Sequence, residues 1–418
     1  DVERSRGLGD VYKRQIIIAV ISVFIVVVAG ISVFLLVKKD KNNNLDPVES
    51  NSRVVNIDGE SEEPGVFAVG GNFLGRQGVL YFDEDNMLTF VDASSGKKAY
   101  VCSDINCEHK PRAKGSYEVD CQAAALTKGT CLMNDKYIYV LGDFKQCADV
   151  NSVDIYRENI DGTGERIINS VEGVQLVVDA YIYDDMIVFT YLNTLDLADI
   201  NNPVDLDTPV GGLVCYDIST DKFIKHEVPV YDDNACEAIA GYVSKNNDNI
   251  LFLGLYSYQD GDSYMSKARM FEWNTTDDTL KEVCETSDMD VLCISGQGWV
   301  YCNDTEMYLE SLDGKNKVSL GGSGKPSVAF WMGDKLYYER FVRDKSYNCY
   351  VYDPAADKAE LIGYHDVDMR YTACSNGYVW FEKHLTDDDG TIISTEFKRM
   401  MPQDYATGNY DKAEAFER

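Results

Sequence analysis

One short strand pattern returns along most of this chain, and it restricts the available folds more than any other feature. A turn residue followed by a run of apolar and aromatic residues occurs in QGVLYF (77–82), DKYIYV (135–140), DDMIVF (184–189), DNILFL (248–253), QGWVYC (297–302), DKLYYE (334–339) and NGYVWF (376–381). Short runs of this kind between Asp, Asn and Gly clusters are typical of strands joined by tight turns. The sequence therefore predicts an all-β protein.

A second strand and a hairpin turn follow six of these copies. They read LTFVDASSGKK, VDIYRENIDGTGE, LVCYDISTDKF, RMFEWNTTDDTL, MYLESLDGKNK and CYVYDPAADKA. Spread over residues 64–413, the repeat has a period of about 50 residues, which is the size of a four-stranded propeller blade. Blades arranged in a ring bury their faces against one another. We expect a β-propeller over residues 64–413 with seven blades, or six if the less regular end units are incomplete. A solenoid or a pair of β-sandwiches fits the repeat less well.

Residues 16–37, IIIAVISVFIVVVAGISVFLLV, form an uncharged apolar stretch. A helix of this length is about 33 Å long, enough to cross the hydrocarbon core of a bilayer. The apolar core of a cleaved signal peptide is usually shorter and ends in a small-residue cleavage site, which is missing here. We expect an uncleaved transmembrane helix that acts as a signal anchor.

The segments on either side of this helix are expected to be short and unstructured. Residues 1–15 contain ERSRGLGDVYKRQ, which reads as translated adapter sequence, so we expect a non-native leader or a short cytoplasmic tail. Residues 38–63 are polar and acidic, as in a flexible linker. Basic residues flank both ends of the helix, but a single N-terminal anchor usually leaves a long C-terminal domain outside. We therefore predict a single-pass cell-membrane protein with an extracytoplasmic propeller.

The repeats resemble membrane-anchored bacterial surface propellers of unknown function. These group with the low-density-lipoprotein-receptor-like β-propeller family and, more loosely, with TolB-like propellers. The resemblance rests on DKYIYV…VDIYRENIDGTGE, DKLYYE…CYVYDPAADKA and the cysteine segment VCSDINCEHK. It departs from the family patterns in lacking a YWTD tetrad and the WD and kelch signatures. It implies a propeller fold and a cell-surface address, and it implies no reaction.

A cluster of cysteines follows the first repeat. It comprises Cys102, Cys107, Cys121, Cys131 and Cys147. Outside the cytoplasm cysteines can persist as disulfides, and closing a loop of 15 residues stabilises a fold by about 3 kcal/mol, so we favour disulfides here. The alternative is a structural zinc site with the Cys₃His donor set of Cys102, Cys107, His109 and Cys121. A third hypothesis is a catalytic Cys107 thiol activated by His109.

The remaining cysteines and histidines are predicted to be structural or solvent-facing. Cys215, Cys302 and Cys349 lie in apolar strand runs and are expected to be buried, while His226, His365 and His384 occur singly and are expected to face solvent. The chain has no G-x4-G-K-[ST], G-x-S-x-G or H-E-x-x-H motif. Catalysis is therefore the less favoured function.

Two long polar excursions, residues 191–212 and 256–268, interrupt the third and fourth repeats at equivalent places. Loops on a rigid propeller commonly carry recognition, and equivalent loops emerge side by side. Tyrosines offer flat amphipathic contacts, and acidic turns supply the oxygen ligands that Ca²⁺ prefers. The candidate binding residues are Tyr256, Tyr258, Tyr264, Asp205 and Asp207. Structural calcium is an alternative for the acidic turns, most of which we interpret as ordinary turns.

The net charge of −31, from 70 acidic and 39 basic residues, disfavours binding to nucleic acid. We interpret the chain as a non-catalytic binding or scaffolding module for an envelope protein, a peptide or a glycan. No cofactor is expected apart from the structural zinc or calcium named above. The alternative is a propeller hydrolase or lyase acting on cell-wall or dietary glycan, which would need carboxylates converging in the central channel.

Overall fold

The computed structural model describes the chain between Val66 and Phe416, with gaps. The described residues are 66–69, 72–75, 77–113, 120–124, 126, 129–142, 152–164, 166–183, 186–196, 204–229, 235–246, 249–260, 263–287, 290–332, 334–342, 346–366, 369–375, 377–386 and 392–416. They belong to one compact unit, Asn51–Arg418. Within these ranges no helix is long and apolar enough to cross a membrane. The predicted leader, transmembrane helix 16–37 and linker all lie outside the described residues.

Almost every element is a strand, and consecutive strands pair antiparallel in groups of four. The first two groups are β2 (Asn72–Leu74), β3 (Gly78–Phe82), β4 (Leu88–Asp92), β5 (Lys98–Tyr100), and β6 (Thr130–Met133), β7 (Tyr137–Gly142), β8 (Ser152–Asn159), β9 (Arg166–Glu172). The next two are β10 (Leu176–Ile182), β11 (Met186–Asp196), β12 (Val204–Asp217), β13 (Lys222–Glu227), and β14 (Ala235–Asn246), β15 (Asn249–Asp260), β16 (Ser263–Asn274), β17 (Thr279–Ser287).

The last groups complete the series. They are β18 (Asp290–Ser295), β19 (Gly298–Cys302), β20 (Met307–Glu310), β21 (Lys317–Ser319); β22 (Lys325–Met332), β23 (Lys335–Val342), β24 (Ser346–Asp353), β25 (Lys358–Asp366); and β26 (Met369–Ser375), β27 (Tyr378–Thr386), β28 (Ile392–Met400), β29 (Glu414–Phe416). The short helices are η1 (Gln122–Ala124), α2 (Pro402–Ala406) and η2 (Tyr410–Lys412), and one further strand, β1 (Val66–Val69), precedes the first group.

The repeated segments of the sequence form the second strand of each group, namely β3, β7, β11, β15, β19, β23 and β27. Every residue of β3 and of β19 is buried on both faces of its sheet. A strand that is covered on both faces has a continuous run of apolar residues, because apolar and polar residues alternate only where one face of the sheet contacts water. The prediction of an all-β fold is confirmed.

The turn between the third and fourth strands is encoded locally. In the third group Asp217 accepts hydrogen bonds through Oδ1 from the backbone N–H groups of Ser219 and Thr220, at 2.7 and 3.1 Å. Asp221 then takes a left-handed φ of 55° and accepts a 2.6 Å bond from the hydroxyl of Tyr216. Asp and Asn tolerate this conformation and bond their own backbone. The same aromatic–Asp/Asn–x–x–x–Asp turn recurs as Trp273–Asp278 and Tyr352–Asp357.

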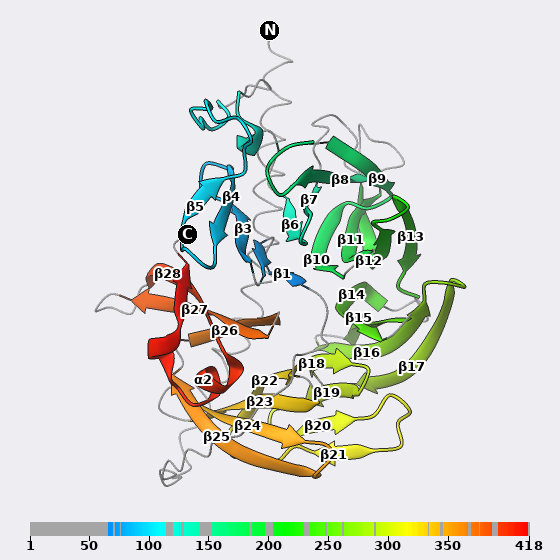
Figure 1. Ribbon diagram of the computed structural model, residues 1–418. Coiled ribbons are helices and arrows are strands. Elements are labelled where there is room, and N and C mark those ends of the chain that lie inside the picture. Colours follow the sequence, from blue (N-terminus) through cyan, green and yellow to red (C-terminus); the bar gives the residue numbers. More distant parts are fainter. Residues whose placement is uncertain are drawn as a thin grey trace, which may run out of the picture. The chain divides into compact units, whose positions relative to one another are not determined.

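The groups follow one another around a common centre, so the fold is a β-propeller (Figure 1). Buried apolar clusters join each group to the next, from the first and second groups onward. A final cluster joins the last group to the first, since Trp380 and Phe416 pack with Leu74 and Tyr81. The ring is therefore closed by side-chain packing between elements more than 300 residues apart in sequence.

Arg399 of β28 lies at this closing contact, which we call the seam. Its side chain is 5% exposed, and Nε donates a 2.6 Å hydrogen bond to Glu414. One of its terminal nitrogens donates to the carbonyl oxygen of Gly75 in the first group, at 3.3 Å. The guanidinium also lies over the rings of Trp380 and Phe416, at 5.5 and 5.3 Å from their centroids. One charged group thus connects the two ends of the ring.

Strand β1 occupies the middle of the ring rather than a place at its rim (Figure 1). It pairs antiparallel with β10 of the third group through Ala68 and Ala180, and with β2 of the first group through Ala68 and Phe73. It also contacts β6 and β26, the first strands of the second and last groups. The segment Val66–Val69 therefore lies across the inner strands of four groups.

The two polar excursions are strands, not open loops. β11 and β12 stay paired as far as Asp196 and Val204, and β15 and β16 as far as Asp260 and Ser263. Extending a hairpin satisfies backbone hydrogen-bonding groups that an open loop would leave to water. The prediction of loops at 191–212 and 256–268 was wrong in this respect.

The two excursions belong to the same continuous sheet, with β14 between them. Val210 of β12 pairs with Ala238 of β14 in a parallel bridge, and Ala238 pairs in turn with Tyr256 of β15. The third and fourth groups are thereby joined into one continuous sheet.

Candidate metal centre

The predicted cysteine cluster lies in the connection from β5 to β6, between the first and second groups. This connection, cyan in Figure 1, lies at the outer edge of the ring beyond β4 and β5. Its described parts are residues 101–113, 120–124, 126 and 129.

A tight turn shapes the first half of the cluster. The N–H of Cys107 donates to the carbonyl oxygen of Asp104 at 3.0 Å, and the Asp104 carboxylate accepts from the N–H of Asn106 at 2.8 Å. Asp at the first position of a turn commonly makes such a bond. His109 then takes a left-handed φ of 49°, and its N–H donates to Cys107 Sγ at 3.4 Å.

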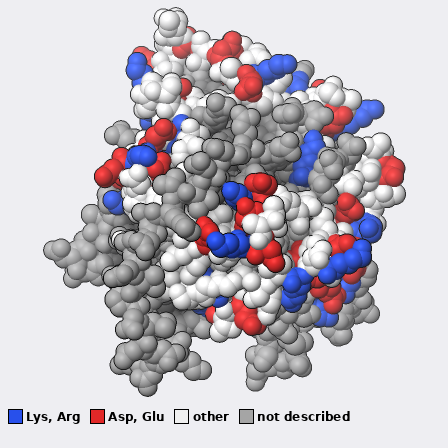
Figure 2. All heavy atoms as spheres, turned by 60° about the horizontal axis from the view of Figure 1, so that its bottom comes forward, with Lys and Arg blue, Asp and Glu red and all other residues white. Residues whose placement is uncertain are grey.

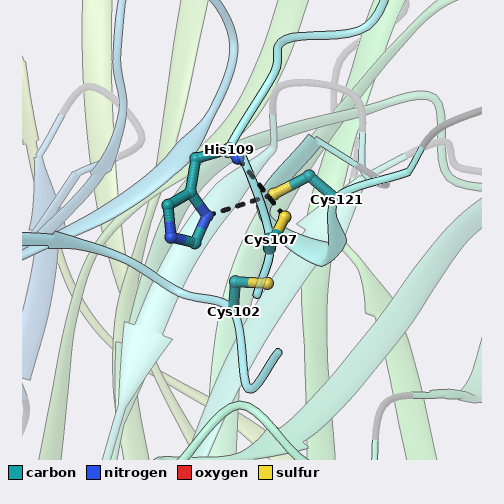
Figure 3. Close-up of side chains that lie close together, drawn as sticks. All are labelled: Cys102, Cys107, His109 and Cys121. Atoms are coloured by element: carbon teal, nitrogen blue, oxygen red, sulfur yellow. Dashed lines mark hydrogen bonds between the residues drawn. The ribbon is translucent and has the colours of Figure 1, made fainter. Parts of the chain in front are cut away.

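The four candidate ligands converge on one point. The sulfurs of Cys102, Cys107 and Cys121 and a ring nitrogen of His109 all lie within 4.8 Å of one another. Figure 3 shows the three sulfurs turned toward each other and His109 Nδ1 facing them, 3.7 Å from Cys121 Sγ. Residues separated by as many as 19 positions are thus brought into one cluster.

The preferred disulfides are not found among the cysteines that the structure describes. Cys102, Cys107 and Cys121 form no disulfide in the described part of the chain. The two sulfurs of a disulfide are about 2.05 Å apart. Here the thiols of Cys102, Cys107 and Cys121 instead form one group with the His109 nitrogen, with all donor atoms within 4.8 Å of one another. Cys131 is buried in β6 and donates to the carbonyl oxygen of Gly129 at 3.9 Å. Cys147 lies outside the described residues.

Burial disfavours a negative charge on the innermost thiol. Cys121 is 1% exposed, and this burial raises the pKa of its thiol to about 12, with a hydrogen bond to Cys107 adding to the shift. A desolvated thiolate is stable only beside a compensating positive charge. Without a cation, the site therefore holds Cys121 as a neutral thiol.

Hydrogen bonds outside the cluster hold its two halves together. Gln122 Oε1 accepts from both the backbone N–H and the hydroxyl of Ser103, at 2.7 and 2.8 Å. On the other side, Gly162 in the β8–β9 turn packs directly on the backbone of Cys102 and Ser103. A Cβ at this glycine would lie 3.0 Å from the Ser103 nitrogen, and its φ is 76°. The cluster therefore contacts both the first and the second groups.

The tyrosines predicted to form an exposed recognition surface are buried, and that prediction was wrong. Tyr256 and Tyr258 are only 2% and 8% exposed, because alternate residues of β15 face the third group. The Tyr256 hydroxyl donates to the carbonyl oxygen of Pro229 at 2.8 Å. The side chains of Tyr264, Asp205 and Asp207 lie outside the described residues.

A second group of potential ligands was missed at the sequence level. Glu339, Cys349 and His365 are all buried with their donor atoms within 4.8 Å of one another. His365 Nε2 lies 2.9 Å from Glu339 Oε1, which also accepts a bond from the Tyr337 hydroxyl. His365 is 1% exposed, so the expectation that it faces solvent was wrong. β25 places His365 against the rings of Tyr347, which is stacked on it, and Tyr405, which is tilted, and no local sequence pattern signals these contacts.

The other expectations have simpler outcomes. Cys215, Cys302 and Cys349 are buried as predicted. His226 is partly exposed, and its Nε2 lies 2.6 Å from Oδ1 of Asp278, while the side chain of His384 lies outside the described residues. Among the residues described, the acidic turns proposed as calcium sites do not form a group of potential ligands.

No protein-family model matches the chain, and no curated protein matches it. Solved structures of similar fold include an acylaminoacyl peptidase in complex with Z-Gly-Gly-Phe-chloromethyl ketone, with a TM-score of 0.51, 9% identity, and coverage of 84% of this chain and 52% of that one. They also include the β-propeller domain of the Trilobed protease from Pyrococcus furiosus (TM-score 0.49, 10% identity, 85% and 97% coverage). TolB from Acinetobacter baumannii matches with a TM-score of 0.33, 10% identity, and 64% and 61% coverage. The chain spans about half the length of the acylaminoacyl peptidase, and the likeness to that protein concerns the fold alone.

Proposed function

We propose that this chain is a seven-bladed β-propeller that binds an envelope protein, a peptide or a glycan without catalysing a reaction. The proposal includes attachment to the outer face of the cell membrane through residues 16–37. The resemblance to membrane-anchored bacterial propellers and the length of the apolar segment support this location.

The pairing of the strands supports the proposed blade number. Seven consecutive antiparallel groups of four strands account for β2 to β29 in the described part of the chain. Each group shares a buried apolar cluster with the next, and the last shares one with the first. Seven blades of about 50 residues agree with the period of the sequence repeat.

The observation that carries the non-catalytic proposal is the position of β1. Propeller channels are lined by the first strand of each blade, and a glycan-cleaving site there needs open space between facing carboxylates. Here Val66–Val69 pairs with β10 and β2 and contacts β6 and β26. A strand hydrogen-bonded across the inner strands leaves less room for substrate at this level of the channel.

The joined sheet of the third and fourth blades is the proposed recognition surface. Its strands β11, β12, β15 and β16 have 11 to 14 residues, whereas those of the fifth blade have 3 to 6. A hydrogen-bonded ribbon of this kind loses little conformational entropy when a partner binds.

Apart from disfavouring strongly anionic partners through the net charge of −31, long-range electrostatics is not expected to select the partner. In Figure 2 basic and acidic side chains are interspersed over the described part of one face. Some described basic side chains are paired with acidic ones, such as Lys325 with Asp304 at 2.8 Å and Arg269 with Glu282 at 3.0 Å. Contacts at short range with the hairpins would therefore determine specificity.

A shortened hairpin tests the proposal. Asn193 and Val210 are cross-strand partners, so replacing residues 194–209 by Asn-Gly closes the ribbon with a two-residue turn and retains the Val210–Ala238 bridge. The matched control replaces residues 354–357 by Asn-Gly between the partners Asp353 and Lys358, at the opposite end of its blade's strands. Partners are identified by cross-linking the full-length chain in envelope extract, followed by mass spectrometry.

We expect the 194–209 variant to lose its specific cross-linked partners and the 354–357 variant to keep them. Equal capture by both variants would contradict the assignment of the surface. Glycan cleavage by the purified full-length chain, screened on cell-wall and dietary polysaccharides, would contradict the non-catalytic proposal and support the hydrolase or lyase alternative.

A further inference from the structure

We propose that Cys102, Cys107, His109 and Cys121 bind one Zn²⁺ ion, which fastens the connection between the first and second blades. The proposal does not depend on the function of the propeller. It rests on the positions of four side chains and on the hydrogen bonds around them.

The separations of the donor atoms fit a tetrahedral ion. With Zn–S bonds of about 2.3 Å and a Zn–N bond of about 2.0 Å, sulfurs lie about 3.8 Å apart and a sulfur lies about 3.5 Å from the nitrogen. His109 Nδ1 is 3.7 Å from Cys121 Sγ, and all four donor atoms lie within 4.8 Å of one another. A small contraction would complete the coordination sphere.

The donor types select the metal. Three soft thiolates and an imidazole favour Zn²⁺ over Ca²⁺ and Mg²⁺, which prefer oxygen ligands. Four protein ligands leave no open position for water or substrate, so the site is structural rather than catalytic. A bound metal would also exclude a nucleophilic role for Cys107, because its thiolate would be coordinated to the ion.

The surrounding hydrogen bonds orient the ligands. The His109 N–H points at Cys107 Sγ, which is the contact that stabilises a metal-bound thiolate. Gln122 joins Ser103 to the segment that carries Cys121, so the two halves of the site are tied independently of the metal. A disulfide would use only two of the three thiols and would leave the third thiol and His109 without a role.

The location explains what the metal would do. Residues 101–109 continue from β5 of the first blade, and Gly162 of the second blade packs on the Cys102 backbone. An ion that fixes this connection would hold the two blades together at their outer edge. It would also hold Ile105, which is 95% exposed, at the tip of the Asp104–Cys107 turn.

The test is metal analysis of the full-length chain, purified in detergent under reducing conditions and dialysed against Zn²⁺. We expect one equivalent of zinc, and on replacement by Co²⁺ the visible absorption bands of tetrahedral thiolate coordination. Cys121→Ser and His109→Ala should weaken binding at least tenfold, measured by competition with a chromogenic chelator. Cys284→Ser and His226→Ala, which alter the same residue types outside the site, should retain wild-type affinity.

The wild-type measurements keep the proposal falsifiable even if Cys121→Ser fails to fold. Absence of stoichiometric zinc and of the Co²⁺ bands in the wild-type chain would overturn it. So would wild-type affinity in His109→Ala, or a mass spectrum that shows a disulfide among Cys102, Cys107 and Cys121 in the untreated protein.

Discussion

Closure of the ring at the seam should depend on the Arg399 guanidinium. Arg399→Met keeps much of the aliphatic stem but removes the charge and every donor. The bond to the Gly75 carbonyl, made by a charged group that is 5% exposed, is worth about 1.5–3 kcal/mol. Contact with the rings of Trp380 and Phe416 adds about 0.5–2 kcal/mol. The Glu414 side chain is 51% exposed, so water screens that ion pair and its contribution is small.

We therefore expect Arg399→Met to lower the free energy of unfolding by about 2–5 kcal/mol. For a domain of about 350 residues the entropy of unfolding is about 0.7 kcal/mol/K, which gives a fall in Tm of about 3–7 °C. The measurement is urea-induced unfolding of the full-length chain in detergent, followed by tryptophan fluorescence. Hydrogen exchange locates the effect, and amides of β2 and β29 should exchange faster than in the wild type.

Arg269→Met provides the matched control. Arg269 pairs with Glu282 and Glu285 and lies 5.9 Å from the Tyr256 ring, but all these contacts fall within the fourth blade. We expect the free energy of unfolding to fall by about 1 kcal/mol and hydrogen exchange at the seam to stay unchanged. If Arg399→Met costs no more than Arg269→Met, or if exchange at β2 and β29 does not change, the reasoning about the seam is refuted.

The remaining predictions concern buried polar groups. His365→Phe should lower the free energy of urea unfolding by about 3–5 kcal/mol, because it leaves the buried Glu339 carboxylate without its imidazole partner, although the Tyr337 hydroxyl still donates to it. Adding Glu339→Leu should recover most of that loss, and an additive double-mutant cycle would contradict this. Burial raises the pKa of Asp179 from 3.8 to about 6, so the folded state holds the proton more tightly and stability should fall as the pH rises from about 4 to about 6. Asp179→Asn should remove this pH dependence and raise the free energy of unfolding by up to about 3 kcal/mol above pH 6. An unchanged pH profile of unfolding would show that the Asp179 carboxyl is better solvated than its position implies. Tyr256→Phe should cost about 1 kcal/mol by removing the bond to Pro229, and a thermal melt equal to the wild type would exclude a contribution from that bond.

Much of the candidate metal site was predictable, because its four ligands lie close together in the sequence. The residue types and spacing of Cys102, Cys107, His109 and Cys121 pointed to zinc as one alternative, because few other arrangements place these donors so near in sequence. What spacing could not decide was the choice between a metal and disulfides. That choice depends on whether the sulfurs meet in pairs or as a group of four donors, and the fold of the connection between the blades determines this.

The strands and their turns are encoded locally, in short stretches of sequence. Apolar runs such as QGVLYF and turns such as Tyr216–Asp221 are specified by neighbouring residues, and they reappear in the structure where the repeat predicts them. Only the tertiary structure decided which faces are covered. Tyr256, Tyr258 and His365 are buried because another blade or a distant aromatic ring lies against them. The contact between Arg399 and Gly75 and the central position of β1 also depend on the tertiary structure. These contacts join segments that lie far apart in the sequence and share no sequence pattern.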